Sequence, residues 1–558
     1  MKGRPHLKKQ TFLFSSAILI LSALAAKLTG AIFRIPLANM LGGTGMGYFS
    51  SAYGIFMTVY AVSVTGLPAA VAKVTAEKSA LERYSDLRRV KSSALLFFSA
   101  VGLAFTAVTM LLAYPFCYFS GGGIAAVPAV LASAPSVFFS CVTSIYRGYY
   151  EGLRNMFPTA VSQIIEGLIK LCSGLALCLI VLKNPQKFTG FFVYFKNTED
   201  PLLPIAAAAA VLGVTLSSAA GTLFLILRDK IGGDGISGEE ISNSAKEIDS
   251  RRTIISALLK TAVPIAIGAL VTNLTSLIDL VTIMRSLGAA AERYPRYFAE
   301  LSGSIPPSEI PNFLFGSFTG LAVTIFNLVP SCTNMFGKGI LPAVSEAFAA
   351  GDKKQVRLST EKALFATALV SFPSAIGICV LSGEILGTLF PTKPLETEIC
   401  TASLSILGIA VAFLCMSSTA FAILQAAGRP ELPVKLMLAG VAVKLAGNLL
   451  LVRIPHLNIA GAAISTLVCY AVICLPALSA VAKLTNADRS YLKGIFCKIC
   501  YCSVMCGGAA LLARNMLSEV LGSLTLLIFS IFCGVIFYIL TALILGILTK
   551  NTLNLLIS

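Results

Sequence analysis

The sequence predicts an all-α polytopic membrane protein with about fourteen transmembrane helices, built as two parallel six-helix lobes plus two appended C-terminal helices. Composition is the first observation behind this fold class: 56% of the residues are hydrophobic and 12% are charged, whereas an ordinary soluble domain has roughly 25% charged residues. The second is a series of apolar stretches of about 20 residues, the length that crosses a bilayer as a helix. These stretches are continuous rather than alternating, which excludes a transmembrane β-barrel.

A loose internal repeat is the third observation, and it predicts the two lobes. Around Pro68 and again around Pro342, an apolar segment ends in Leu-Pro-Ala, a short basic stretch follows, and a second apolar segment begins. The difference between these residue numbers, 342 − 68 = 274, is the repeat offset. The same offset (444 − 170) separates Lys170 from Lys444, each inside an apolar run. A polar insert at 289–311 accounts for a smaller offset near the start of the second copy, so we expect an internal duplication.

The apolar stretches, taken in order, give the predicted spans. They are 11–41, 47–73, 92–114, 123–147, 158–182, 203–227, 253–286, 312–348, 360–382, 399–426, 432–452, 458–482, 492–513 and 519–548. The region between 379 and 400 is interrupted by Gly383, Pro391 and Pro394 and has the least regular pattern.

These spans divide the chain into five predicted parts. The parts are a cytoplasmic basic tail (1–10), an N-terminal six-helix lobe (11–228), a cytoplasmic inter-lobe loop (229–252), a C-terminal six-helix lobe (253–482) and two appended helices, the thirteenth and fourteenth (483–558).

The distribution of Lys and Arg predicts that both termini lie in the cytoplasm. With the N-terminus inside, about 28 of the 43 basic residues fall on the cytoplasmic side, among them Arg147 and Arg154 in a connection; an excess of this kind marks cytoplasmic loops. The apolar segment after Lys8 and Lys9 resembles a signal peptide, but removing it would leave an odd number of spans. The net charge of +17 predicts a face attracted to anionic membrane lipids and gives no reason to expect a nucleic acid partner.

The sequence offers no motif for catalysis. It has only two histidines, His6 and His456, and it contains no phosphate loop, HExxH motif or nucleophile elbow. Four cysteines cluster, but they have no neighbouring histidine and do not share one helical face; they are Cys497, Cys500, Cys502 and Cys506. We therefore expect a protein that is not an enzyme, with no metal site and no cofactor.

Basic residues inside the predicted spans are the main candidates for a binding site. A charge within a span costs a few kcal/mol, so it normally faces a polar interior or a partner. Lys27 and Arg34 are seven residues apart and therefore share one face of the first span. Lys170, Lys338 and Lys444 lie in later spans. An excess of positive charge in the interior predicts an anionic substrate, such as one that carries phosphate.

Acidic and amide side chains complete the candidate site. Glu166 is four residues before Lys170, a spacing that allows an intrahelical pair; Glu166 and Asp279 are also candidates for coupling to an ion or a proton. The polar residues expected along the cavity are Asn273, Asn327, Asn334 and Asn448. The alternative is that these are structural pairs and that Lys260 and Arg285 are snorkelling side chains near span ends. Two copies of a helical unit around a polar interior are typical of alternating-access transporters.

Three stretches of the sequence resemble a known family. They are residues 26–42, residues 48–74 (YFSSAYGIFMTVYAVSVTGLPAAVAKV) and residues 338–352 (KGILPAVSEAFAAGD). They are similar to the SpoVB/YtgP branch of the polysaccharide transporters in the MOP exporter superfamily, which also contains MurJ, Wzx and the MATE exporters. The resemblance implies a fourteen-helix flippase that moves a lipid-linked sugar diphosphate to the outer leaflet.

The resemblance also bears on the site residues. It implies a cationic cavity that includes basic residues of the first helix, which Lys27 and Arg34 match. The chain departs from the MurJ-like pattern at TIFNLVPS (324–331), where an arginine is expected. Asn327 cannot replace that charge, so Lys338, Lys170 and Lys444 are the candidates to supply it. This departure bears on the identity of the substrate more than on the class of protein.

The hypothesis is a lipid-linked oligosaccharide flippase of the bacterial plasma membrane, most plausibly for a peptidoglycan precursor, in vegetative or sporulation wall synthesis. Lys27, Arg34, Lys170 and Lys444 would hold the diphosphate, with coupling to Na⁺, H⁺ or the membrane potential. Its partners would be the lipid-linked sugar, membrane lipids and cell-wall synthesis proteins. The alternatives are a MATE-like cation or drug antiporter, which should have an acidic interior, a membrane-embedded glycosyltransferase or polymerase, and a non-transporting scaffold of a cell-wall complex.

Overall fold

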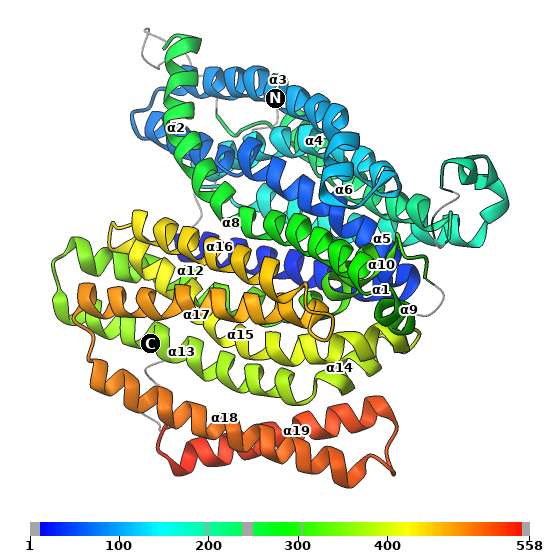
Figure 1. Cartoon of the computed structure of the whole chain (residues 1–558). Coiled ribbons are helices and arrows are strands. Elements are labelled where there is room, and N and C mark those ends of the chain that lie inside the picture. The colour runs from blue at the N-terminus through cyan, green and yellow to red at the C-terminus, as the bar shows by residue number, and fades with distance from the viewer. Residues whose placement is uncertain (1–11, 196–197, 199, 237–248, 303–304, 549–558) are drawn as a thin grey trace. The chain divides into compact units, whose positions relative to one another are not determined.

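The computed structural model describes residues 12–195, 198, 200–236, 249–302 and 305–548. Within these ranges the chain forms helices, turns and irregular segments, and no strand (Figure 1). Thirteen helical stretches of this described part are long and apolar enough to cross a membrane. The fold class predicted from the sequence, an all-α polytopic membrane protein, is confirmed.

The first of these stretches accounts for two of the predicted spans. Helix α1 (Phe12–Ser63) has 52 residues, which would extend about 78 Å as a straight helix, against a hydrocarbon core of about 30 Å. It is interrupted at Gly42, whose φ of 62° and ψ of −171° are not helical. The predicted spans at 11–41 and 47–73 therefore meet at this kink, and the second of them ends earlier than predicted.

A short helix follows before the third span. Helix α2 (Leu67–Ala80) carries Pro68 at its N-terminus, where the missing N–H of proline costs nothing. Gly66 precedes it, and a Cβ at this position would lie 2.2 Å from the carbonyl oxygen of Ala262. The turn can therefore approach helix α8 (Arg251–Arg293) only with glycine at this position.

Four long helices complete the part of the chain that precedes the inter-lobe loop. They are α3 (Tyr84–Ser120), α4 (Val127–Gly152), α5 (Phe157–Lys183) and α6 (Leu203–Gly232), with 3₁₀ turns at Ile124–Ala126 and Pro185–Phe195. Prolines occupy the first turns of α4, α5 and α6. Helix α4 continues to Gly152, so the prediction that Arg147 lies in a connection is wrong: this residue lies within the helix.

The rest of the chain follows α8. The helices are α9 (Pro295–Ser302), α10 (Ile310–Ser317), α11 (Val323–Phe326), α12 (Leu328–Ala349), α13 (Lys353–Val380), α14 (Ser382–Leu389), α15 (Pro394–Ala426), α16 (Glu431–Leu451), α17 (Asn458–Thr485), α18 (Arg489–Leu517) and α19 (Ser523–Ile544), with a π-helical turn at Phe318–Ala322. The span predicted at 312–348 is broken by this turn and by Asn327. The irregular region around 379–400 contains the short helix α14.

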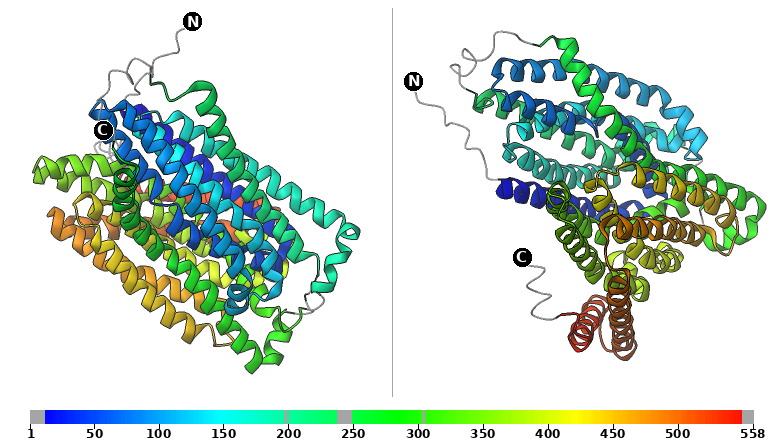
Figure 2. Two further views of the ribbon diagram at one scale, coloured as in Figure 1. Left: turned by 90° about the horizontal axis from the view of Figure 1, so that it is seen from above. Right: turned by 90° about the vertical axis from the view of Figure 1, so that its left-hand side faces the viewer.

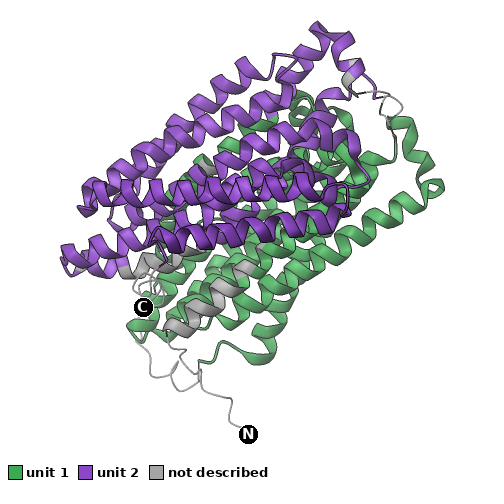
Figure 3. Ribbon diagram, turned by 90° about the horizontal axis from the view of Figure 1, so that it is seen from below, with its two compact units in different colours: residues 1–280 green, residues 281–558 purple. Residues whose placement is uncertain are grey.

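Contacts divide the chain into two compact units, Met1–Leu280 and Val281–Ser558 (Figure 3). In each unit the long helices run alongside one another (Figure 2). The division falls inside α8, so the part of this helix from Arg251 to Leu280 belongs with unit 1. The predicted start of the second lobe at 253 stays a prediction.

Each unit has an apolar core of similar composition. In unit 1, buried residues of α2, α3 and α4 pack with the α8 residues Ile254, Leu258 and Ala262. In unit 2, buried residues of α12, α13 and α15 pack with residues of α17, α18 and α19. Several pairs of core positions are related by the repeat offset; they are Ala70 and Val344, Val90 and Leu364, and Ala94 and Ala368.

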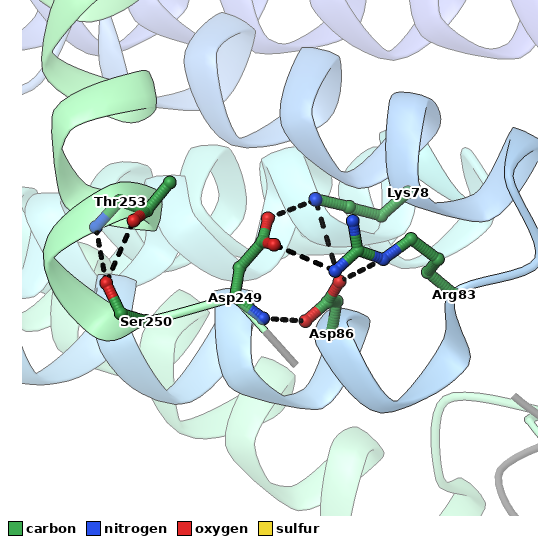
Figure 4. Close-up of polar contacts among 6 residues, drawn as sticks. All are labelled: Lys78, Arg83, Asp86, Asp249, Ser250 and Thr253. Atoms are coloured by element: carbon green, nitrogen blue, oxygen red, sulfur yellow. Dashed lines mark hydrogen bonds and ion pairs between the residues drawn. The ribbon is translucent and has the colours of Figure 1, made fainter. Parts of the chain in front are cut away.

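Ion pairs attach the beginning of α8 to unit 1. We call Lys78, Arg83, Asp86 and Asp249 the α8 cluster (Figure 4). Arg83 Nε lies 2.6 Å from Asp86 Oδ2, and Arg83 Nη2 lies 2.8 Å from Asp249 Oδ1. Lys78 contacts both carboxylates, and the backbone N–H of Asp249 donates to Asp86 Oδ1 at 2.9 Å. Two cations thus face two carboxylates at the start of the helix that leads from unit 1 into unit 2.

A related group attaches the beginning of α18 to unit 2. We call Arg357, Glu361 and Asp488 the α18 cluster. Arg357 Nε lies 2.8 Å from Glu361 Oε1, and its Nη2 lies 3.6 Å from Asp488 Oδ2. The backbone N–H of Asp488 donates to Glu361 Oε1 at 3.0 Å. Asp488 also caps α18 by accepting from two backbone N–H groups of its first turn.

Candidate functional site

Unit 1 contains a polar cavity of about 210 Å³ within the apolar helices. It is lined by residues of α1, α4, α5 and α6. Its described charged lining residues are Arg147, Glu166 and Lys170. The described side chains that bring hydroxyl or amide groups to it are Tyr60, Ser140, Thr143, Ser144, Gln163, Ser217 and Ser218. A polar pocket of this kind in a membrane-spanning bundle is a candidate for a substrate or ion pathway.

Helical spacing explains how two apolar helices supply these polar groups. On α5, Gln163, Glu166 and Lys170 are separated by three and four residues, which places them on one face. On α4, a second series at positions 140, 143, 144 and 147 has the same spacing and ends in Arg147. The cavity lies between these two polar faces, and residues of α1 and α6 complete its lining.

Arg147 is the functional candidate that sequence reasoning missed. Its Nη2 lies 2.9 Å from Glu166 Oε1, and its Nε donates to Ser162 Oγ at 2.9 Å. The side chain is 14% exposed. The polar series that precedes it on α4 is the sequence signal that indicates it. A helical face that carries hydroxyls and an arginine is unfavourable in contact with lipid, so it indicates a face turned toward the protein interior.

Glu166 has a different ion-pair partner from the one its spacing suggested. The four-residue spacing allows an intrahelical pair with Lys170, but in the structure Glu166 pairs with Arg147 on another helix. Lys170 lines the same cavity and extends toward α1, where its Nζ lies 5.6 Å from the ring centroid of Phe33. Among the side chains that the structure describes, the charged groups lining the cavity are therefore two cations and one carboxylate.

Of the two candidate basic residues of α1, the structure describes the surroundings of Arg34. The guanidinium carbon of Arg34 lies 5.1 Å from the ring centroid of Tyr53, a cation–π arrangement. Lys27 follows Ala26, which lines the cavity, but the Lys27 side chain lies outside the described part of the structure. The same holds for the side chain of Lys338 in α12.

Unit 2 holds Lys444 in a buried position. It is 5% exposed and lies one turn before Asn448 on α16. Asn448 Nδ2 donates to Thr282 Oγ1 of α8 at 3.0 Å. Both predicted residues are therefore in the interior of the unit rather than at its lipid-facing surface.

The remaining candidates have mixed surroundings. Asn273 and Asn327 each donate to a backbone carbonyl four residues earlier in their own helix, at 2.9 Å. Asn334 accepts a hydrogen bond from Ser418. Asp279 lies in α8, close to the division between the units. The structure thus brings Glu166 and Lys170 together in one cavity. Of the other candidates, those with described side chains do not appear in its lining, and the side chains of Lys27 and Lys338 are outside the described part.

Comparisons of sequence place the chain among membrane flippases. The family model "Polysaccharide biosynthesis protein" matches residues 12–348, and the model "Lipid II flippase MurJ" matches residues 319–532. Stage V sporulation protein B of Bacillus subtilis is 23% identical over 383 residues, which cover 68% of this chain and 67% of that protein. Lipid II flippase MurJ of the same organism is 22% identical over 470 residues, which cover 81% and 79%.

Solved structures share the fold. Lipid II flippase MurJ in an inward closed conformation has a TM-score of 0.67 at 15% identity, covering 96% of this chain and 98% of that one. An inward-facing multidrug resistance MATE transporter of the MOP superfamily has a TM-score of 0.61 at 13% identity, covering 83% and 96%. At these identities the similarity establishes the helical architecture.

Proposed function

The chain belongs to the polysaccharide biosynthesis protein family, within the flippases of the MOP superfamily, and on that premise we propose that it moves a polyprenyl-diphosphate sugar across the bacterial plasma membrane. A peptidoglycan precursor of the lipid II type is the substrate we favour. The proposal takes alternating access as the mechanism, with both termini in the cytoplasm.

The cationic cavity of unit 1 is the observation that carries this proposal. Its described charged side chains are Arg147, Lys170 and Glu166, so cations exceed carboxylates inside a bundle of apolar helices. An unpaired charge in such a place is costly, and a diphosphate would supply both the opposite charge and acceptors for charge-assisted hydrogen bonds. A sugar headgroup would find hydroxyl and amide partners along the same wall.

Five basic residues are the proposed ligands of the diphosphate. Lys27, Arg34 and Lys170 belong to unit 1, and Lys338 and Lys444 belong to unit 2. Export of a diphosphate moves negative charge outward, which an inside-negative potential favours by about 2.3 kcal/mol per charge per 100 mV. Membrane potential is therefore the driving force we propose, with Na⁺ or H⁺ binding at Asp279 or Glu166 as the alternative form of coupling.

Reconstitution tests the proposal directly. Proteoliposomes would contain a fluorescent lipid-linked disaccharide diphosphate, and its appearance in the outer leaflet would be followed by quenching, with and without an imposed potential. We expect flipping by the wild type and a loss of at least tenfold in Lys170→Ala and in the Lys27→Ala/Arg34→Ala double variant. The exposed Lys73→Ala variant is the matched control. Full transport by the cavity variants would contradict the diphosphate site.

A MATE-like cation antiporter is the second candidate, because MATE transporters share the fold. The sign of the cavity argues against it, since a cation site needs an acidic interior. Efflux of a cationic dye from the same proteoliposomes discriminates the two: transport of the dye without flipping of the lipid would favour the antiporter.

A further inference from the structure

The ion pair between Arg147 and Glu166 occurs in only one of the two copies of the predicted repeat. At the repeat offset, Lys170 corresponds to Lys444, and buried Cys141 corresponds to buried Cys415. At the same offset, Arg147 corresponds to Phe421 and Glu166 corresponds to Gly440. The second copy therefore forms the matching helices without either charge, so the pair is not a requirement for forming this part of the fold.

The position of the Glu166 side chain depends on a glycine of the neighbouring helix α6, Gly221. A Cβ at Gly221 of α6 would lie 2.4 Å from Glu166 Oε1, and the same oxygen lies 2.9 Å from Arg147 Nη2. The carboxylate thus occupies the space over Gly221, between α6 and the guanidinium. It presents to Arg147 a negatively charged oxygen that accepts from the guanidinium, as an oxygen of a phosphate group would.

We propose that Arg147 binds the anionic phosphate of the substrate and that Glu166 occupies Arg147 in the empty protein as an internal substitute for that anion. This inference rests on the proposed function and adds an arginine to its binding site. Arrival of the substrate exchanges one oxyanion for another at Arg147, so the guanidinium is never left without a counter-charge inside the membrane. Return of Glu166 to Arg147 helps to release the product.

The remaining groups of the cavity suit this exchange. Lys170, on the same helix as Glu166, lines the cavity and can attract the carboxylate when it leaves Arg147. Tyr60 of α1 also lines the cavity, and its hydroxyl can donate a hydrogen bond to either oxyanion. The α6 residues Ser217 and Ser218 line it as well, with their hydroxyls donating to the carbonyl oxygen of Val214 at 2.7 and 3.3 Å. Arg147 stays oriented through its Nε, which donates to Ser162 Oγ at 2.9 Å.

Pyrophosphate binding to the full-length protein in detergent tests the exchange. Isothermal titration calorimetry with inorganic pyrophosphate would compare the wild type with Arg147→Gln, Glu166→Gln and Gly221→Ala. We expect Arg147→Gln to weaken binding about tenfold, because it removes the guanidinium. We expect Glu166→Gln and Gly221→Ala each to strengthen pyrophosphate binding several-fold. Glu166→Gln neutralises the competing carboxylate, whereas Gly221→Ala displaces this carboxylate from Arg147 without changing any charge.

The controls separate exchange from a structural ion pair. Lys73 and Glu77 form an exposed pair on α2, so Lys73→Gln and Glu77→Gln make the same charge changes and should leave binding unchanged. In a Glu166→Gln/Arg147→Gln double variant, the gain from Glu166→Gln should disappear. If Arg147→Gln does not fold, Arg147→Lys can be used in its place. Lysine keeps the positive charge but lacks the paired N–H donors of the guanidinium, so this variant should still weaken binding.

Two results would overturn the inference. One is unchanged or weaker binding in both Glu166→Gln and Gly221→Ala, which would make the pair structural. The other is an absence of binding in the wild type and in both of these variants. Flipping of the lipid is a separate measurement: a protein that binds pyrophosphate through Arg147 but does not flip the fluorescent lipid would contradict the proposed function and leave the exchange standing.

Discussion

The α8 cluster and the α18 cluster attach helices in different units by the same arrangement. In each, an arginine near the start of one helix pairs with an acid one turn later: Arg83 with Asp86, and Arg357 with Glu361. In each, that acid also accepts from the backbone N–H of an aspartate that precedes the next attached helix. The two arginines are related by the repeat offset, since 357 − 83 = 274.

The clusters differ in burial and in charge. The side chain of Asp86 is 1% exposed, whereas that of Glu361 is 11% exposed; Arg83 is 25% exposed and Arg357 is 44% exposed. The α8 cluster also has a second cation, Lys78, which contacts both of its carboxylates. Electrostatic interactions strengthen as the surroundings become less polarisable, so the attachment of the helix that joins the two units is expected to be the stronger one.

The largest effect is expected from Asp86→Asn. This change leaves Arg83 and Lys78 with one carboxylate in place of two, and breaking a buried charge network of this kind costs about 3 kcal/mol. Thermal unfolding of the purified protein in detergent would measure the loss. A change in stability no greater than that of the exposed Glu77→Gln control would show that burial does not strengthen this cluster.

A smaller effect is expected from the matching change, Glu361→Gln. Its partner Arg357 is close to half exposed, and Gln keeps an oxygen that can accept from the backbone N–H of Asp488, so about 1 kcal/mol should be lost. The same unfolding measurement applies. If Glu361→Gln destabilised the protein as much as Asp86→Asn, the comparison between the clusters would fail.

The smallest effect is a dependence on pH. The hydrogen bond from Lys78 holds the pKa of Asp249 below its ordinary value of 3.8. A carboxyl with a lowered folded-state pKa stabilises the protein above its unfolded pKa, and this contribution is lost as the pH falls through the folded value. The stability difference between the wild type and Asp249→Asn should therefore be constant near neutral pH and shrink below about pH 4. A difference that stayed constant down to about pH 3 would contradict the assignment.

The sequence was sufficient for the helices because a run of apolar residues is a local signal. The kink at Gly42 was harder to predict. A glycine-rich link between two spans does not show whether the spans form two separate helices or one continuous, kinked helix. Arg147 was hard to predict for a different reason: the apolar run that predicts α4 ends at this residue, whereas the helix continues to Gly152. Hydropathy marks where a membrane-like segment ends, and a helix can extend beyond it.

The candidate site was only partly predictable. Lys170 and Glu166 could be selected because charges inside apolar runs are rare, and they do share a cavity. The pairing of Glu166 with Arg147 depends on how α4 and α5 pack, and spacing along one helix favoured Lys170 instead. Asp249 could not be linked to Arg83 at all, because a single aspartate after a polar loop has no periodicity that points to a distant partner.

Helix α8 shows that the boundaries of a sequence repeat need not coincide with the boundaries of a compact structural unit. The second predicted copy starts near residue 253, yet Ile254, Leu258 and Ala262 fill the core of unit 1. A fragment that stopped at residue 250 would expose the apolar surface that these three side chains cover, and would be prone to aggregate or to be degraded. Anyone who splits this protein for complementation, or exchanges halves between relatives, should keep residues 251–280 with the first half.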